Sequence, residues 1–312
     1  MAGRNRQSAT TADWLADRVL RLLIGALLAL PYERRVRLGG WMMRHVLAPI
    51  AGYNRRSMAN LAHVFPQMPR AERRHIAAQV ADNMGRTFIE NYSAREFLAR
   101  HRDAPILGPG LRALEEAREK GRPVILVTGH FGNYEAPRAA LVGRGFEVGG
   151  LYRPARNRFF NEHYERTMMA YGGPIFAQGR RGTAGFVRHL RAGGQLVLLF
   201  DQHVARGAAL PFLGQPAKTA LSAAELALRY DALLIPFYGT RNPDGLSFTI
   251  EMEAPVPYSD PETMTRALNA SLEARVRRHP GQWLWVHRRW KVAGRKPQRR
   301  RAAPSTGPGP AS

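Results

Sequence analysis

Short apolar runs alternate with amphipathic stretches from Leu111 to Arg278 of this 312-residue chain. The apolar runs are rich in β-branched residues and have the length of buried strands. The strands that we expect are 123–128, 146–152, 174–177, 195–200, 233–238 and 246–252. The helices that we expect are 111–119, 134–143, 157–171, 182–192, 219–230 and 261–278. Because strands separated by helices are typical of βαβ units, the sequence predicts an α/β fold with a mostly parallel central sheet flanked by helices.

The stretch Pro123–Pro137 carries the clearest sign of chemistry. An apolar run between Gly121 and Gly129 predicts a strand buried on both faces, and His130 follows where this strand ends. Residues from Tyr134 onward favour a helix, so Glu135 is expected at the helix start. Open α/β sheets bind their ligands at the carboxyl ends of the strands, which makes this turn a candidate active site.

His130 and Glu135 are the residue types of a catalytic base and its orienting carboxylate. An imidazole can accept a proton from a hydroxyl nucleophile, and a carboxylate on its other ring nitrogen would fix the tautomer. Gly132 and the helix start would offer backbone N–H groups to a developing oxyanion. Spacing alone leaves a purely structural role open, because a histidine and a glutamate five residues apart are common.

Several familiar catalytic signatures are absent from the sequence. It has no cysteine, no Gly-x-Ser-x-Gly elbow, no His-Glu-x-x-His zinc motif and no dinucleotide fingerprint. We therefore expect no metal and no cofactor. The simplest chemistry for His130 is direct transfer to a substrate hydroxyl without a covalent intermediate.

The charge of the chain predicts an acidic partner. Lys and Arg number 47 against 24 Asp and Glu, which gives a formal net charge of +23. A nucleic acid, an anionic membrane surface or an acidic carrier protein would suit such a surface. Few aromatic residues interrupt the basic runs and no nucleic-acid-binding module is recognisable, so we expect no nucleic acid.

The ends of the chain differ in composition from its body. Residues 1–13 are predicted to be disordered, and 293–312 to form a disordered basic tail. Between them we expect a helical membrane-anchoring region over 14–105 and a catalytic α/β domain over 106–292. The apolar run 22–31 is flanked by arginines and is shorter than the ~20 residues needed to span a bilayer. We interpret it as an anchor lying in the membrane surface, with a marginal single span or a buried core helix as alternatives.

The turn Gly129-His130-Phe131-Gly132-Asn133-Tyr134-Glu135 resembles the His-x4-Asp/Glu motif of glycerolipid-type acyltransferases. It is nearest to the form found in the bacterial lipid A biosynthesis (late) acyltransferases. Four further stretches resemble that family in the same order and extend the resemblance over about residues 15–292: Asn60-Leu61 with Phe65-Pro66, Asn83 to Arg86 and Glu90; Tyr152-Arg153-Pro154 with Asn157; Asp201-Gln202 with Phe212 to Thr219; and Trp283 to Trp290.

The resemblance implies an enzyme on the cytoplasmic face of the cell inner membrane. Such an enzyme moves a fatty acyl chain from acyl-acyl carrier protein to a hydroxyl of a Kdo-bearing lipid A precursor, an anionic glycolipid. His130 would be the general base and Glu135 its orienting partner, while Arg153, Asn157 and Asp201 would contribute to substrate binding.

Two other functions remain open from the sequence. A relative with the same motif would acylate another membrane glycolipid, such as a phosphatidylinositol mannoside. More remotely, the chain would be a non-catalytic basic protein that binds membrane or nucleic acid.

Overall fold

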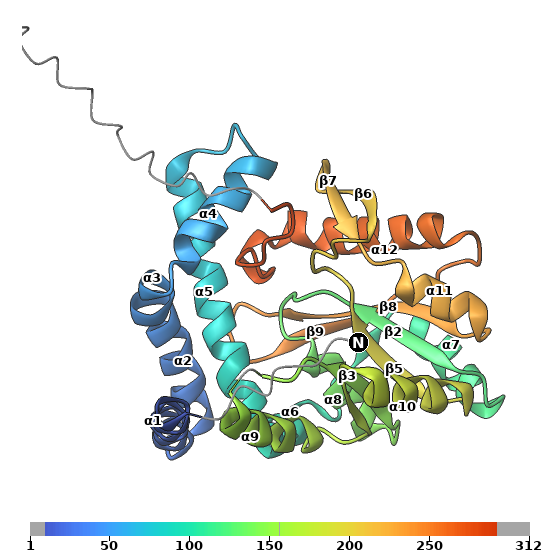
Figure 1. The fold of residues 1–312 in the computed structure, drawn as a ribbon, viewed down its shortest axis with the longest axis horizontal. Helices are drawn as coiled ribbons and strands as arrows, with labels where there is room; N and C mark the ends of the chain where they lie inside the picture. The colour runs from blue at the N-terminus through green and yellow to red at the C-terminus, as the bar shows by residue number, and fades with distance from the viewer. Residues whose placement is uncertain (1–9, 156, 292–312) are drawn as a thin grey trace, which may run out of the picture.

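The computed structural model describes residues 10–155 and 157–291. Its centre is a seven-stranded sheet in the order β1-β9-β8-β2-β5-β3-β4, in which neighbouring strands are parallel except for the antiparallel pair β8 and β9. The strands are β1 (Ile106–Leu107), β2 (Val124–Thr128), β3 (Val148–Tyr152), β4 (Ile175–Ala177), β5 (Gln195–Leu199), β8 (Leu233–Arg241) and β9 (Phe248–Met252). The predicted mostly parallel α/β architecture is confirmed (Figure 1).

Helices cover both faces of this sheet. Those that follow the predicted pattern are α7 (Gly110–Glu119), α8 (Glu135–Gly143), α9 (Arg158–Met169), α10 (Arg180–Arg191), α11 (Ser222–Arg229) and α12 (Pro261–Arg278). Alternate residues of β2 belong to two separate cores, because successive side chains of a strand point to opposite faces. Ile125 and Val127 pack with residues of α10, α11 and α12, whereas Val124 and Leu126 pack with residues of α7 and α8.

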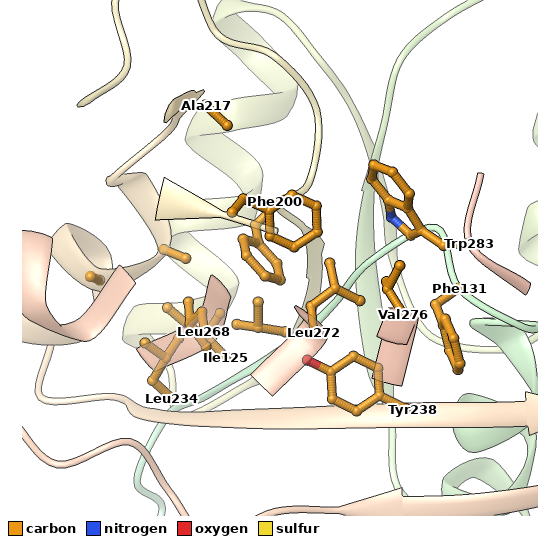
Figure 2. Packing of buried hydrophobic residues seen from close by; sticks show 14 of the residues in the cluster. Ile125, Phe131, Phe200, Ala217, Leu234, Tyr238, Leu268, Leu272, Val276 and Trp283 are labelled. Carbon is orange, nitrogen blue, oxygen red and sulfur yellow. The ribbon is translucent and has the colours of Figure 1, made fainter. Parts of the chain in front are cut away.

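Figure 2 shows the first of these cores at close range, with Leu268 and Leu272 of α12 lying near Ile125 and Leu234 of the sheet. Leu268 and Leu272, four residues apart on one face of the helix, are each at most 1% exposed. Asp260 caps the helix by accepting the N–H groups of Glu262 and Thr263 at 3.0 Å. α12 is therefore fixed at its start by a side-chain cap and along its length by apolar burial.

The N-terminal region is helical. It comprises α1 (Thr11–Leu28), α2 (Tyr32–Met42), the π-helix η1 (Met43–Leu47), α3 (Ala48–Ile50), α4 (Tyr53–Val64), α5 (Arg70–Tyr92) and α6 (Ala94–His101). In Figure 1, α5 stands between the sheet and the outer layer of α1, α2 and α3 at the left edge. Leu61 and Val64 of α4 and Ile76 and Val80 of α5 join the same core as α12, so this region shares a hydrophobic core with the central sheet.

Disorder was predicted for residues 1–13, but α1 begins at Thr11. Thr10 and Asp13 form a capping box, in which each side chain accepts the other residue's backbone N–H at 3.1 Å. The remaining predicted disorder, in residues 1–9 and in the tail 293–312, lies outside the described residues. No helix in the part of the chain that the structure describes is both long enough and apolar enough to cross a membrane.

The hairpin of β6 (Ala208–Phe212) and β7 (Gln215–Thr219) was not predicted. Its alternating burial, with Leu210 and Phe212 inward, is the period-two signal of a strand. The turn carries two residues of positive φ, Leu213 at 54° and Gly214 at 78°. This pattern suits a two-residue hairpin, but leucine seldom adopts it, and so the sequence did not point to a turn there.

Candidate active site

His130 lies opposite Asp201 because two neighbouring strands run in parallel and in register. β2 pairs with β5 from Val124 opposite Gln195 to Thr128 opposite Leu199. The backbone N–H of Phe200 still donates to the carbonyl of Thr128 at 3.2 Å, so the two chains leave the sheet side by side. Two residues beyond each strand end, His130 and Asp201 meet at the carboxyl edge of the sheet, where α/β folds place their sites.

Three donors hold the carboxylate of Asp201. Its Oδ1 lies 2.7 Å from His130 Nδ1, and its Oδ2 accepts the His130 backbone N–H and the Trp283 indole N–H, each at 2.8 Å. Burial of this fully enclosed side chain by itself raises its pKa. The charge and hydrogen bonds of His130, with a contribution from His287, outweigh that effect and lower the pKa of Asp201 below its ordinary value.

The tautomer of His130 follows from this arrangement. An ionised carboxylate can only accept hydrogen bonds, so Nδ1 of the imidazole carries the proton and Nε2 keeps a lone pair. The His130 side chain is 19% exposed, which leaves Nε2 accessible, and its nearest polar neighbour is the Gln202 amide nitrogen at 3.4 Å. The ring is therefore held ready to accept a proton from a bound hydroxyl.

A cavity of about 530 Å³ opens next to His130, within the range typical of ligand pockets. One wall is apolar and comes largely from β3, β5 and α11. Its polar lining residues include His130, Glu135, Arg138, Arg153, Gln178 and Gln202. A partly apolar cavity beside an accessible imidazole suits a lipid-like substrate with a reactive polar group.

Glu135 was expected to orient His130, but Asp201 occupies that position. The carboxylate of Glu135 pairs with Arg138 at 3.2 Å, and both side chains are at most 10% exposed. Arg138 also donates to the carbonyls of Val148 and Gly172. The helical spacing of Glu135 and Arg138 joins the two on one face of α8, and the pair forms part of the cavity wall.

The three residues expected to bind substrate have different positions in the structure. Arg153 is exposed and lines the cavity, where a bound molecule could reach it. Asn157 instead caps α9 by accepting the N–H groups of Phe159 and Phe160, and its amide donates to the carbonyl of Asp13. Asp201 is fully buried with three donors in place, so it holds His130 and does not face the substrate.

The expected backbone oxyanion site is already occupied by internal hydrogen bonds. The N–H of Gly132 donates to the carbonyl of Gln282 at 2.9 Å, and the N–H of Asn133 donates to the carbonyl of Gly239 at 3.1 Å. The N–H of Glu135, at the start of α8, donates to the side chain of Asn133 at 2.9 Å. Since these three N–H groups bind within the fold, they are not available to a substrate oxyanion.

A buried ion pair supports the same turn. Arg241 of β8 binds both carboxylate oxygens of Glu90 at 2.5 and 2.7 Å, and Glu90 also accepts from the amide of Asn133 at 2.7 Å. The Arg241 Nε donates to Asn83 at 2.7 Å, and Asn83 in turn donates to the carbonyl of Gly132 at 3.0 Å. Asn83 and Glu90 belong to motifs that the resemblance identified, whereas Arg241, the last residue of β8, was missed.

The tryptophan-rich segment Trp283–Trp290, which follows α12, contacts both Asp201 and His130. Trp283 holds Asp201, while the amide of Asn60 ties the segment to α4 through the carbonyls of Trp285 and His287 at 2.6 and 2.8 Å. The ring of His287 lies edge-on to that of His130, with centroids 4.6 Å apart. Arg289 of this segment is fully buried and donates to two backbone carbonyls and to the hydroxyl of Thr219.

The comparisons with known proteins agree on one family. The bacterial lipid A biosynthesis acyltransferase family matches residues 2–292. The chain is 27% identical to a lipid A biosynthesis acyltransferase of Haemophilus influenzae, over 89% of this chain and 90% of the relative. It is 27% identical to the lipid A biosynthesis lauroyltransferase of Escherichia coli K12, over 89% and 91%. It is 24% identical to the myristoyltransferase of the same organism, over 78% and 76%. The chain therefore belongs to the bacterial lipid A biosynthesis acyltransferase family.

Proposed function

We propose that this acyltransferase moves a fatty acyl chain from acyl-acyl carrier protein to a hydroxyl of a Kdo-bearing lipid A precursor. The observation that carries the proposal is the imidazole of His130, held by Asp201 and aimed at an apolar cavity. The family provides the reaction class. The donor and the acceptor are our inference from the resemblance and from a net charge of +23, which suits an acidic carrier and an anionic lipid.

In the proposed mechanism, His130 Nε2 removes the proton from the acceptor hydroxyl as the oxygen attacks the thioester carbonyl. A tetrahedral intermediate forms, the C–S bond breaks, and the departing thiolate takes the proton back from the imidazolium. The ester and the free carrier thiol are the products. Asp201 stabilises the transient imidazolium through its short contact with Nδ1, and it stays ionised because its pKa is lowered.

Gln202 is our candidate for stabilising the oxyanion. Its amide nitrogen lies 3.4 Å from His130 Nε2, beside the position that the reacting carbonyl would take. When an acceptor hydroxyl displaces the amide from the imidazole, its N–H group becomes free to donate to the developing negative charge. The backbone N–H groups of Gly132 and Asn133 are unsuitable, since each already donates within the fold.

The walls of the cavity support separate places for the two ends of a lipid substrate. Leu198, Phe200 and Leu151 offer apolar surface for a hydrocarbon chain. Arg153, an exposed residue of the cavity lining, offers a guanidinium for an anionic group such as a phosphate or carboxylate. We further propose that the enzyme works at the cytoplasmic face of the inner membrane, where the carrier and the lipid acceptor would meet.

An assay with purified components tests this function. Enzyme, acyl-acyl carrier protein and a defined Kdo-bearing lipid A precursor are combined, and ester formation is followed by mass spectrometry. His130→Ala should lower the rate on the order of 10²–10⁴-fold. His75→Ala, which removes an exposed histidine from α5, is the matched control and should leave the rate unchanged.

Lipids from a deletion strain give an independent check on the acceptor. Loss of one secondary acyl chain from lipid A supports the proposal. Unaltered lipid A together with a change in another glycolipid would mean that the acceptor is wrong while the acyltransferase chemistry holds.

A further inference from the structure

A second hollow, which we name the N-terminal cleft, lies on the helical layer outside α5. It has a volume of about 510 Å³ and shares no residue with the cavity at His130. Its lining residues come from α2, η1 and α5: Arg34, Arg37, Leu38, Trp41, Arg44, His45, Asp82 and Arg86. These elements form the left side of the molecule in Figure 1. Five of the eight are arginine or histidine, so the cleft is strongly basic.

Two of the helices that line this cleft, α2 and α5, pack closely against each other. α2 and α5 approach so tightly at Gly39 and Gly85 that a Cβ on Gly85 would overlap the backbone of Gly39. One residue further, a Cβ on Gly40 would lie 2.6 Å from Asp82 Oδ1, which shows that the Asp82 side chain rests on this glycine. The chain then enters the π-helix η1, a rare form that is often found at functional sites.

The acids near the cleft are already paired with other arginines. Asp82 accepts from Arg86 at 2.6 Å, and Glu33 accepts from Arg100 at 2.6 Å. Arg34, Arg37 and Arg44 are all exposed. Within residues 10–155 and 157–291, none of these three lies within 4.0 Å of a carboxylate oxygen. Three exposed guanidinium groups around one hollow favour an anion, and arginine is especially suited to phosphate.

Exposed apolar side chains lie in the cleft lining and in the helical segments that follow it, η1 and α3. Trp41 is 54% exposed, Leu47 46% and Ile50 81%, while Leu22 of the neighbouring α1 is 73% exposed. The ring of Trp41 also lies against that of His45, with centroids 5.4 Å apart. Tryptophan and arginine beside exposed aliphatic residues are typical of helices that lie in a membrane interface.

We propose that the N-terminal cleft binds the phosphate of anionic phospholipid headgroups while Trp41, Leu47 and Ile50 insert into the bilayer surface. This rests on the proposed function only in that the enzyme takes a lipid acceptor. An acidic carrier protein would also suit the arginines. However, a carrier must deliver its chain to His130, and the exposed apolar groups beside the cleft are better explained by acyl chains.

Co-sedimentation of the purified full-length protein with vesicles tests the proposal. Neither an acyl donor nor an acceptor is present, so the result does not depend on the proposed reaction. The charge variant replaces Arg34, Arg37 and Arg44 with Gln. The control variant also replaces three exposed arginines with Gln, and so loses the same charge away from the cleft. These are Arg112 of α7, Arg191 of α10 and Arg229 of α11. A thermal melt of each variant verifies that it is folded.

We expect the charge variant to bind vesicles containing phosphatidylglycerol about fivefold more weakly per arginine, or roughly 100-fold in all. Its binding to pure phosphatidylcholine vesicles should change little, and the control should keep most of its affinity for both. Ile50→Asp should weaken binding to both kinds of vesicle, because it removes an inserted apolar group.

Two results would overturn the proposal. One is equal loss of affinity in the charge variant and its control, since net charge alone would then explain the binding. The other is unchanged vesicle binding by the charge variant with lost binding to acyl carrier protein, which would assign the cleft to the carrier.

Discussion

The Oδ1 atom of Asp201 lies 2.7 Å from Nδ1 of His130, although the two residues are 71 positions apart in the chain. Each follows the end of a central strand, and the parallel register of β2 and β5 brings them together. The pairing of β2 with β5 in the sheet therefore determines this contact, and no single loop does. Trp283 adds a third element by donating its indole N–H to the same carboxylate at 2.8 Å.

Replacing Asp201 by Asn should lower turnover on the order of 10²–10⁴-fold with little change in the KM of the lipid acceptor. An amide can donate to Nδ1, which moves the imidazole proton to Nε2 and removes the lone pair that accepts the substrate proton. The measurement is steady-state kinetics on the purified variant. Circular dichroism and a melting curve ensure that the loss is not one of folding.

Glu135→Gln provides the sharper contrast. The tautomer of His130 is read by ¹⁵N chemical shifts of the imidazole in both variants. We expect Asp201→Asn to change the tautomer and Glu135→Gln to leave it unaltered, because Glu135 pairs with Arg138 instead. A tautomer change in Glu135→Gln alone would restore the original assignment of Glu135 as the orienting carboxylate.

Much of the α/β architecture was predictable because its signals are local. Buried parallel strands appear as apolar runs, and Val124–Thr128 is buried at every position. The start of α12 is marked in the sequence as well, by the N-cap residue Asp260 and by Pro261 in the first turn. By contrast, the partner of His130 depends on which strands are neighbours. The sequence places Asp201 directly after the expected strand 195–200, which is where a site residue would lie. Only the strand order, with β5 next to β2, shows that Asp201 is the partner of His130.

Other parts of the site had no local signal. Arg241 ends β8, three residues beyond the strand predicted over 233–238, and its partner Glu90 comes from α5, some 150 residues earlier. Asn157 was interpreted as a substrate ligand although asparagine is equally suited to cap a helix, as it does here. Residues that act through long-range pairing are thus the ones that sequence reasoning assigns least well.

Replacing Glu90 by Gln should destabilise the fold by about 3–5 kcal/mol. The change leaves the buried guanidinium of Arg241 without its counter-charge, and removing one member of a buried pair costs far more than the pair contributes. Urea unfolding measures the loss. As a control, Glu116→Gln breaks the exposed pair with Arg112 on α7 and should cost at most about 1 kcal/mol.

A glycine-to-alanine pair tests the rigidity of the catalytic turn. Gly132 has φ 52°, and a Cβ there would overlap the carbonyl oxygen of Gly239. Gly121 has a similar φ of 63°, but its Cβ would meet nothing within 4 Å. Gly121→Ala should therefore lower the free energy of unfolding by only about 1 kcal/mol, because alanine disfavours the left-handed backbone conformation. Gly132→Ala should cost more and also lower activity, because the turn that carries His130 must shift. Equal melting temperatures for the two variants would show that the turn can move freely.

Stability should fall as the pH is lowered from about 6.5 towards 4. Burial lowers the pKa of His101 to about 4, against an ordinary value of about 6.5 in the unfolded chain. Between these values the unfolded state binds a proton that the folded state does not, so protonation favours unfolding. The stabilisation is complete above about pH 6.5, declines as the pH falls and is lost below about 4, for a total of about 3 kcal/mol.

His101→Phe isolates this effect. The ring of His101 packs against Phe97 and Phe248, with centroids 4.5 and 5.1 Å apart, so phenylalanine suits the same apolar surroundings. Urea unfolding of both proteins at about pH 7 and about pH 5 gives the difference in pH dependence. Burial also lowers the pKa of His287 to about 4. The stability of the variant should therefore still decrease somewhat as the pH falls. A variant that loses stability on acidification as steeply as the parent would show that His101 is not the group that titrates.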